Sequence, residues 1–120
     1  MEYKFINTEY LDSVSGGDPE IICELVNLFR EQSVEISAEM QSLFSSGNYQ
    51  LLGLLAHKAK SSVSIMGMND LAAMLKTFEV QAREEKESHL YEAYIARFQS
   101  ETLEAIAELE DLVTKLLNSN

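Results

Sequence analysis

Residues 47–67 read GNYQLLGLLAHKAKSSVSIMG, an amphipathic segment bounded by two glycines. Its apolar residues recur at the three- and four-residue spacings that mark one face of a helix. They are Leu52, Leu55, Ala59, Val63 and Met66. Gly67 is placed to end the helix in a left-handed turn. The segment therefore predicts a helix whose buried face needs further helices to cover it.

The chain upstream of this segment predicts a second, longer helix. Asp18 supplies a capping carboxylate and Pro19 suits a first helical turn, so the helix is expected to begin there. Apolar residues then keep helical spacing up to about Ser45, where the helix should end. Residues 9–14 predict a short additional helix that lies across one end of the others.

Two more helices are predicted downstream. Asn69 can cap the first, which has one apolar face and is followed by a polar connection at residues 83–88. The second is long, with apolar residues at helical spacing from Tyr91 to Leu116, and no stretch alternates as a strand would. We therefore expect an all-α, up-and-down four-helix bundle with a short extra N-terminal helix, formed as a single domain over residues 1–120.

The composition is that of a folded, acidic protein. The chain has 120 residues and a net charge of −11, with 46% hydrophobic and 24% charged residues. This surplus of acidic side chains argues against a nucleic-acid partner and against binding to anionic lipid. A single cysteine, Cys23, permits no intramolecular disulfide, and the sequence shows neither a signal peptide nor a membrane-spanning run. We expect a soluble, cytoplasmic protein.

One segment departs from this acidity. Residues 53–83 carry four basic and two acidic side chains, and they include His57, one of only two histidines. The four bases are Lys58, Lys60, Lys76 and Arg83. On a helix with about 100° between residues, His57 lies opposite the apolar stripe, so its imidazole should be exposed. The outward residues around it are Gly53, Lys60, Ser61 and Ser64, with Lys58 alongside.

This arrangement suits an imidazole that reacts with a group held by another protein. Small residues such as Ser61 let a partner's surface come close, and Lys60 can neutralise phosphoryl oxygens. A neutral imidazole is a good nucleophile toward phosphorus, and the phosphoramidate that it forms is labile enough to pass the group on. The same spacing is also compatible with an ordinary solvated histidine, and spacing alone does not choose between these interpretations.

Residues 56–67, AHKAKSSVSIMG, resemble the signature of histidine-containing phosphotransfer (HPt) domains. In that signature an Ala-His pair is followed by Lys three residues after the His, by small residues, and by Gly ten residues after the His. The resemblance extends over nearly the whole chain. Further matching positions are the Gly16–Glu20 helix start, Phe29, the Gly47-Asn48 break, Leu71, Leu75 and Glu79. It implies a four-helix bundle with an exposed histidine midway along one helix, in agreement with the helical spacing.

The resemblance implies roles for particular residues. His57 would be the phosphoacceptor, and Lys60 would support the phosphoryl group. Glu79 lies where the family often has Gln or Glu facing the imidazole, so it would orient one ring nitrogen; the alternative is a solvated helix carboxylate. Ser61 departs from the family, which usually has Gly directly after that Lys, and it adds a hydroxyl at the contact with a partner.

The resemblance also implies the partners. The protein would accept the phosphoryl group from the phospho-aspartate of a response-regulator receiver domain, or act with a hybrid histidine kinase, and pass the group to another receiver. It would act as a monomer without a cofactor of its own, and Mg²⁺ would arrive with the receiver. The helices expected at residues 48–66 and 69–84 would form the docking face. Its contact residues would be Gly53, Lys58, Ser61, Ser64, Met68 and Lys76.

No catalytic apparatus is visible in the sequence. It lacks a Gly-rich phosphate loop and a Ser/His/Asp set, so we expect a carrier rather than an enzyme. His89 has Glu85 and Glu92 at helical spacing, but a di-iron bundle needs Glu-x-x-His patterns from several helices, so no metal site is predicted. The alternative function is an acidic helical adaptor, or a degenerate HPt-like module, that binds a partner without phosphotransfer.

Overall fold

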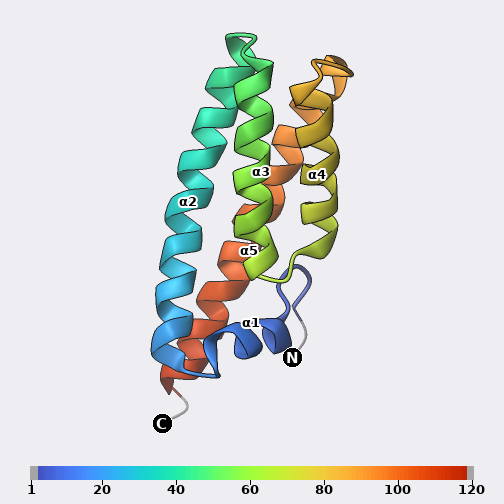
Figure 1. Ribbon diagram of the computed structural model, residues 1–120. Helices are drawn as coiled ribbons and strands as arrows, with labels where there is room; N and C mark the ends of the chain where they lie inside the picture. Colours follow the sequence, from blue (N-terminus) through green and yellow to red (C-terminus); the bar gives the residue numbers. More distant parts are fainter. Residues whose placement is uncertain (1–2, 119–120) are drawn as a thin grey trace.

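Helices account for most of residues 3–118, the part of the chain that the computed structural model describes (Figure 1). They are α1 Thr8–Ser15, α2 Pro19–Ser45, α3 Tyr49–Ile65, α4 Asn69–Arg83, the short 3₁₀ turn η1 Ser88–Leu90 and α5 Tyr91–Asn118. The four long helices run alternately up and down, and these residues contain no strand. The predicted fold, an all-α four-helix bundle with a short N-terminal helix, is confirmed.

The start of α2 and the end of α3 follow from local capping, whereas Asn69 is the first residue of α4 and, contrary to expectation, its side chain does not cap that helix. The Asp18 carboxylate accepts a hydrogen bond from a first-turn backbone N–H at 2.9 Å, and Pro19 occupies the first position of α2. Gly67 has a φ of +75°, and the N–H of Met68 reaches back to the carbonyl of Val63 at 3.1 Å. This left-handed turn closes the end of α3, as the sequence predicts.

The bundle axis is filled by the apolar faces of the helices. Its largest fully buried side chains are Leu11, Ile22, Phe29, Ile36, Met40, Leu52, Met66, Leu71, Leu75, Phe78, Tyr91 and Phe98. Burying one such side chain contributes about 1.5–3 kcal/mol, so the core holds each helix in one rotation about its own axis. The rotation of α3 in turn decides which of its residues face outward. Within residues 3–118, no helix combines the length and apolar character needed to cross a bilayer.

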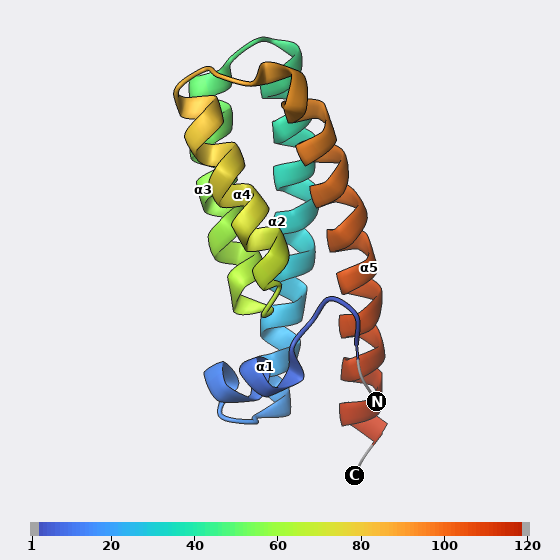
Figure 2. The ribbon, with the colours of Figure 1, turned by 90° about the vertical axis from the view of Figure 1, so that its right-hand side faces the viewer.

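The helices of the bundle differ in length. α2 and α5 have 27 and 28 residues, whereas α3 and α4 have 17 and 15. The two longer helices therefore extend beyond the α3–α4 turn, and α1 lies across the bundle at this end (Figures 1 and 2). The predicted position of the short helix is confirmed.

Residues 3–7, which precede α1, form a strap over the same end of the bundle. The carboxylate of Glu108 on α5 accepts hydrogen bonds from three successive backbone N–H groups, those of residues 4–6, at 2.8 to 3.1 Å. The N–H of Asn7 donates to the carbonyl of Met66 at 3.1 Å. The strap thus joins α5 to the α3–α4 turn.

Met68, at this turn, is only 3% exposed and lies in the core cluster with Ile6 of the strap. The expectation that Met68 is a contact residue of the docking face is therefore wrong. The strap covers the turn so closely that a Cβ on Gly67 would lie 2.5 Å from the Cβ of Asn7. Helical spacing does not reveal this cover, because it comes from a segment distant in the sequence.

Candidate functional site

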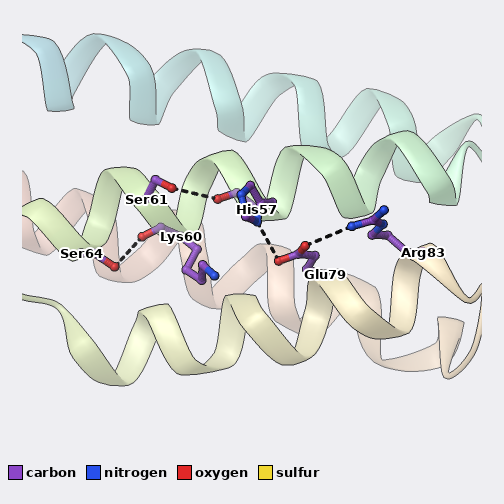
Figure 3. Close-up of polar contacts among 6 residues, drawn as sticks. All are labelled: His57, Lys60, Ser61, Ser64, Glu79 and Arg83. Atoms are coloured by element: carbon purple, nitrogen blue, oxygen red, sulfur yellow. Dashed lines mark hydrogen bonds and ion pairs between the residues drawn. The ribbon is translucent and has the colours of Figure 1, made fainter.

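His57 lies midway along α3, with its imidazole directed out of the bundle (Figure 3). Its side chain is 57% exposed, whereas Ala56 and Ala59 beside it are fully buried. Because the core sets the rotation of α3, the outward position of His57 follows from the apolar stripe on the opposite face. The predicted exposure of His57 is confirmed.

The Glu79 carboxylate of α4 lies next to this imidazole. Its Oε1 is 3.1 Å from Nδ1 of His57, and only 5% of the residue is exposed. Burial alone raises the pKa of Glu79. The hydrogen bond and charge of His57, with the charges of Lys76 and Lys60, outweigh burial, so the net pKa of this carboxyl is lower than its ordinary value. Glu79 is therefore ionised at neutral pH.

An ionised carboxylate can only accept a hydrogen bond, which assigns the proton of the neutral imidazole. In the neutral ring, the N–H therefore belongs to Nδ1 of His57 and donates a hydrogen bond to Oε1 of Glu79, while Nε2 keeps its lone pair. The contact that the resemblance implies for Glu79 is present. Its alternative, a solvated helix carboxylate, is wrong because α3 packs over this part of α4 and keeps water from it.

Gly53 is buried where α3 meets α4. A Cβ at this position would lie 2.6 Å from Cγ of Arg83 and 3.0 Å from the backbone oxygen of Glu79. The expectation that Gly53 contributes to an outward docking surface is therefore wrong. Its physical role is to let two helices approach closely, which a residue with a side chain would prevent.

Arg83 is a residue of the site whose contact the sequence does not reveal. Its Nη1 is 3.4 Å from Oε2 of Glu79, the oxygen that does not face His57. Figure 3 shows the resulting series of contacts from Arg83 through Glu79 to His57. In the sequence, the four-residue spacing of Glu79 and Arg83 on one helix permits an ion pair between them. It does not indicate that the same carboxylate also contacts His57.

The bases of this part of the chain do not form one continuous patch. Lys60 is half-buried and Lys76 is exposed, and both lie close enough to lower the pKa of Glu79. With Arg83 they surround the carboxylate on the α3–α4 side. Lys58 is exposed on the other side of α3, where it lines a groove between α2 and α3.

Ser61 and Ser64 extend the outward face of α3 beyond His57. The Ser61 hydroxyl is exposed and lies 3.5 Å from the carbonyl of His57, a weak contact. The half-buried Ser64 hydroxyl donates to the carbonyl of Lys60 at 2.8 Å. Both hydroxyls are thus turned toward their own helix, as serines in helices often are. These small side chains therefore do not protrude beside the imidazole.

His89 lies in η1, away from this site, and its Nε2 is 3.5 Å from a carboxylate oxygen of Glu87. Residues 3–118 contain no group of three or more His, Cys, Asp and Glu side chains that could hold a metal ion. The spacing of His89 with Glu85 and Glu92 therefore does not bring those three side chains together.

Comparison with known proteins gives one match. The sequence model of the Hpt domain family matches residues 24–119 of the chain. This range holds the whole of α3, α4 and α5, with His57 and Glu79, and most of α2. The curated proteins and the solved structures gave no match.

Proposed function

Because the chain belongs to the Hpt domain family, we propose that it accepts a phosphoryl group on His57 from a receiver-domain aspartate and relays it to another receiver. Hpt domains are phosphocarrier modules of phosphorelays, in which they work with receiver domains and histidine kinases. The observation that carries the proposal is the state of one side chain. The His57 ring is exposed, and its Nδ1 proton is held by a buried carboxylate, which leaves Nε2 as the nucleophile.

The transfer begins with attack of Nε2 on phosphorus. As the N–P bond forms, the P–O bond to the receiver's aspartate breaks, and the aspartate leaves as a carboxylate. Nδ1 keeps its proton throughout, so the phosphorylated ring is cationic, and the ionised Glu79 stabilises that charge. The reverse of these steps delivers the group to a second receiver. The chain acts as a monomer, and Mg²⁺ is bound by the receiver whose aspartate reacts.

Lys60 supports the phosphoryl group in this proposal. It lies one helical turn after His57, and its stem is half-buried, which restricts the positions that its ammonium can take. A phosphoryl group on Nε2 brings negative charge next to the Glu79 carboxylate, and the Lys60 charge offsets that repulsion.

The docking face extends toward α2. Leu51 and Leu54 are exposed on the α2 side of α3, in the groove that Lys58 also lines. Exposed apolar side chains beside a reactive group favour contact with another protein. We place the receiver over α3, between this groove and Lys76 on α4. Ser61 and Ser64 lie within this area.

Incubation with a receiver that carries radiolabelled phosphate tests the proposal. The wild type should take up acid-labile, alkali-stable label, and His57→Gln should take up none. His89→Gln is the matched control, because it removes the only other histidine and should be labelled like the wild type. Lys60→Ala should be labelled more slowly while its circular dichroism stays helical.

Two results would count against phosphotransfer on His57. Full labelling of His57→Gln would mean that another residue accepts the group. If the wild type and His57→Gln bind the receiver with equal affinity, and the wild type never carries label, the protein is a binding-only adaptor.

A further inference from the structure

We propose that Arg83 is a positioning residue for phosphotransfer: it anchors Oε2 of Glu79, so that Oε1 stays directed at Nδ1 of His57. The inference rests on the proposed function of His57, but its first readout is a property of the unphosphorylated protein. It assigns Arg83 no contact with the phosphoryl group or with the partner.

The geometry around Glu79 is that of a carboxylate held at both oxygens. Oε1 lies 3.1 Å from Nδ1 of His57, and Oε2 lies 3.4 Å from Nη1 of Arg83. The carboxylate is buried, whereas the side chains of His57 and Arg83 are each 57% exposed. A glutamate side chain has several rotatable bonds, and one contact leaves the carboxylate plane free to turn. The second contact restricts that freedom.

The approach of α3 and α4 gives Arg83 its position. The stem of Arg83 crosses Gly53 so closely that a Cβ there would lie 2.6 Å from Cγ of Arg83 and 3.0 Å from its backbone nitrogen. Backbone atoms in the middle of a packed helix pair cannot move aside without a large cost in packing energy. Gly53 is therefore the residue that lets the arginine stem lie against α3 and extend its guanidinium to Glu79.

Without Arg83, other cations would compete for the carboxylate. Lys60 approaches Glu79 from α3, and Lys76 approaches it from α4. A carboxylate turned toward either lysine would no longer accept the Nδ1 proton of His57 in a fixed direction. The neutral imidazole would then populate both tautomers, and the fraction with its lone pair on the outward Nε2 would fall.

Arg83→Met tests this proposal because methionine keeps an unbranched stem against Gly53 and removes the guanidinium. Arg97→Met is the matched control, since Arg97 also pairs with a glutamate four residues away, Glu101, at 2.6 Å, but on α5. The ring nitrogens of His57 are observed by two-bond ¹H–¹⁵N correlation in the unphosphorylated protein. We expect the Nδ1–H tautomer in the wild type and in Arg97→Met, and a mixture of tautomers in Arg83→Met.

The transfer rate gives the second readout. Arg83→Met should slow labelling of His57 by about threefold to tenfold, and Arg83→Lys, which keeps the positive charge, should restore most of the rate. In a Glu79→Ala background Arg83→Met should have no further effect, because the arginine acts only through that carboxylate.

Several results would overturn the proposal. One is that Arg83→Met matches Arg97→Met in tautomer and rate. The others are that it slows transfer without changing the tautomer, or slows transfer equally when Glu79 is absent. Each is incompatible with positioning through Glu79. Failure of the proposed function is a separate result, since the wild type would then take up no label while the tautomer comparison still gives its answer.

Discussion

At the scale of single residues, the site depends on one buried carboxylate. Glu79 meets His57 with one oxygen and Arg83 with the other. Removing a carboxylate from water is costly, and its partners must compensate for that cost. The pKa of Glu79 is lowered despite its burial, because the hydrogen bond and charge of His57, with the charges of Lys76 and Lys60, more than offset the loss of hydration. The same contacts that orient the imidazole therefore also stabilise the fold.

Glu79→Gln should lower stability at neutral pH and lower it less in acid. A carboxyl with a lowered pKa in the folded state stabilises the fold above its unfolded pKa, which is near 4.5 here. That contribution is lost as the pH falls through the folded value. We expect the free energy of unfolding to drop by on the order of 1 kcal/mol at neutral pH. Urea denaturation of the wild type and Glu79→Gln, at neutral pH and below pH about 4, measures the difference in their free energies of unfolding. A difference that does not narrow in acid contradicts this account.

At the scale of the elements, helical spacing predicts the fold better than it predicts the site. The start of α2 at Asp18 and the end of α3 at Gly67 depend on local hydrogen bonds, which the sequence makes visible. The cover over a helix depends on its neighbours. Spacing places Gly53 outward, and Met68 is expected as a docking contact, yet α4 covers the first and residues 3–7 cover the second.

His57 and Arg83 show the same division. The exposure of His57 follows from the apolar stripe of its own helix, so the sequence predicts it. The contact of Arg83 with Glu79 depends on how closely α4 approaches α3 at Gly53. The spacing of residues within one helix does not predict the distance between two helices. The Glu79 contact was accessible only through the family resemblance, which places a side chain of that kind opposite the histidine.

The proposed docking face on α3 makes a prediction for Leu54, which is 51% exposed. Leu54→Asp should weaken receiver binding by about tenfold, because it replaces an apolar contact with a charge that must be desolvated. Leu103→Asp is the matched control, since Leu103 is 66% exposed in a groove between α2 and α5. Calorimetric titration with the receiver measures both affinities. Equal weakening by the two variants would mean that the receiver does not dock over Leu54.

At the scale of the whole molecule, charge separates the site from the rest of the protein. The chain carries a net charge of −11, yet Lys60, Lys76 and Arg83 gather around one buried carboxylate. A locally positive area on an acidic protein attracts an acidic partner surface to one place and repels it elsewhere. The distribution of charge thus favours one orientation of a partner over the bundle.

The strap over the end of the bundle makes a stability prediction. Glu108→Ala removes the acceptor of three backbone N–H groups and should reduce the free energy of unfolding by about 1–3 kcal/mol. Glu104→Ala, at an exposed position of α5, is the control. Denaturant unfolding of both variants measures the effect. If Glu108→Ala costs no more than Glu104→Ala, the strap does not contribute to the stability of the bundle.

The sharing of one carboxylate by three successive amides also has a consequence for hydrogen exchange. Release of Glu108 frees the amides of residues 4–6 in a single step, so their deuterium uptake should follow one common opening rate. The buried amides of α3 would report global unfolding instead. Exchange at three neighbouring positions therefore distinguishes local opening of the strap from global unfolding of the domain.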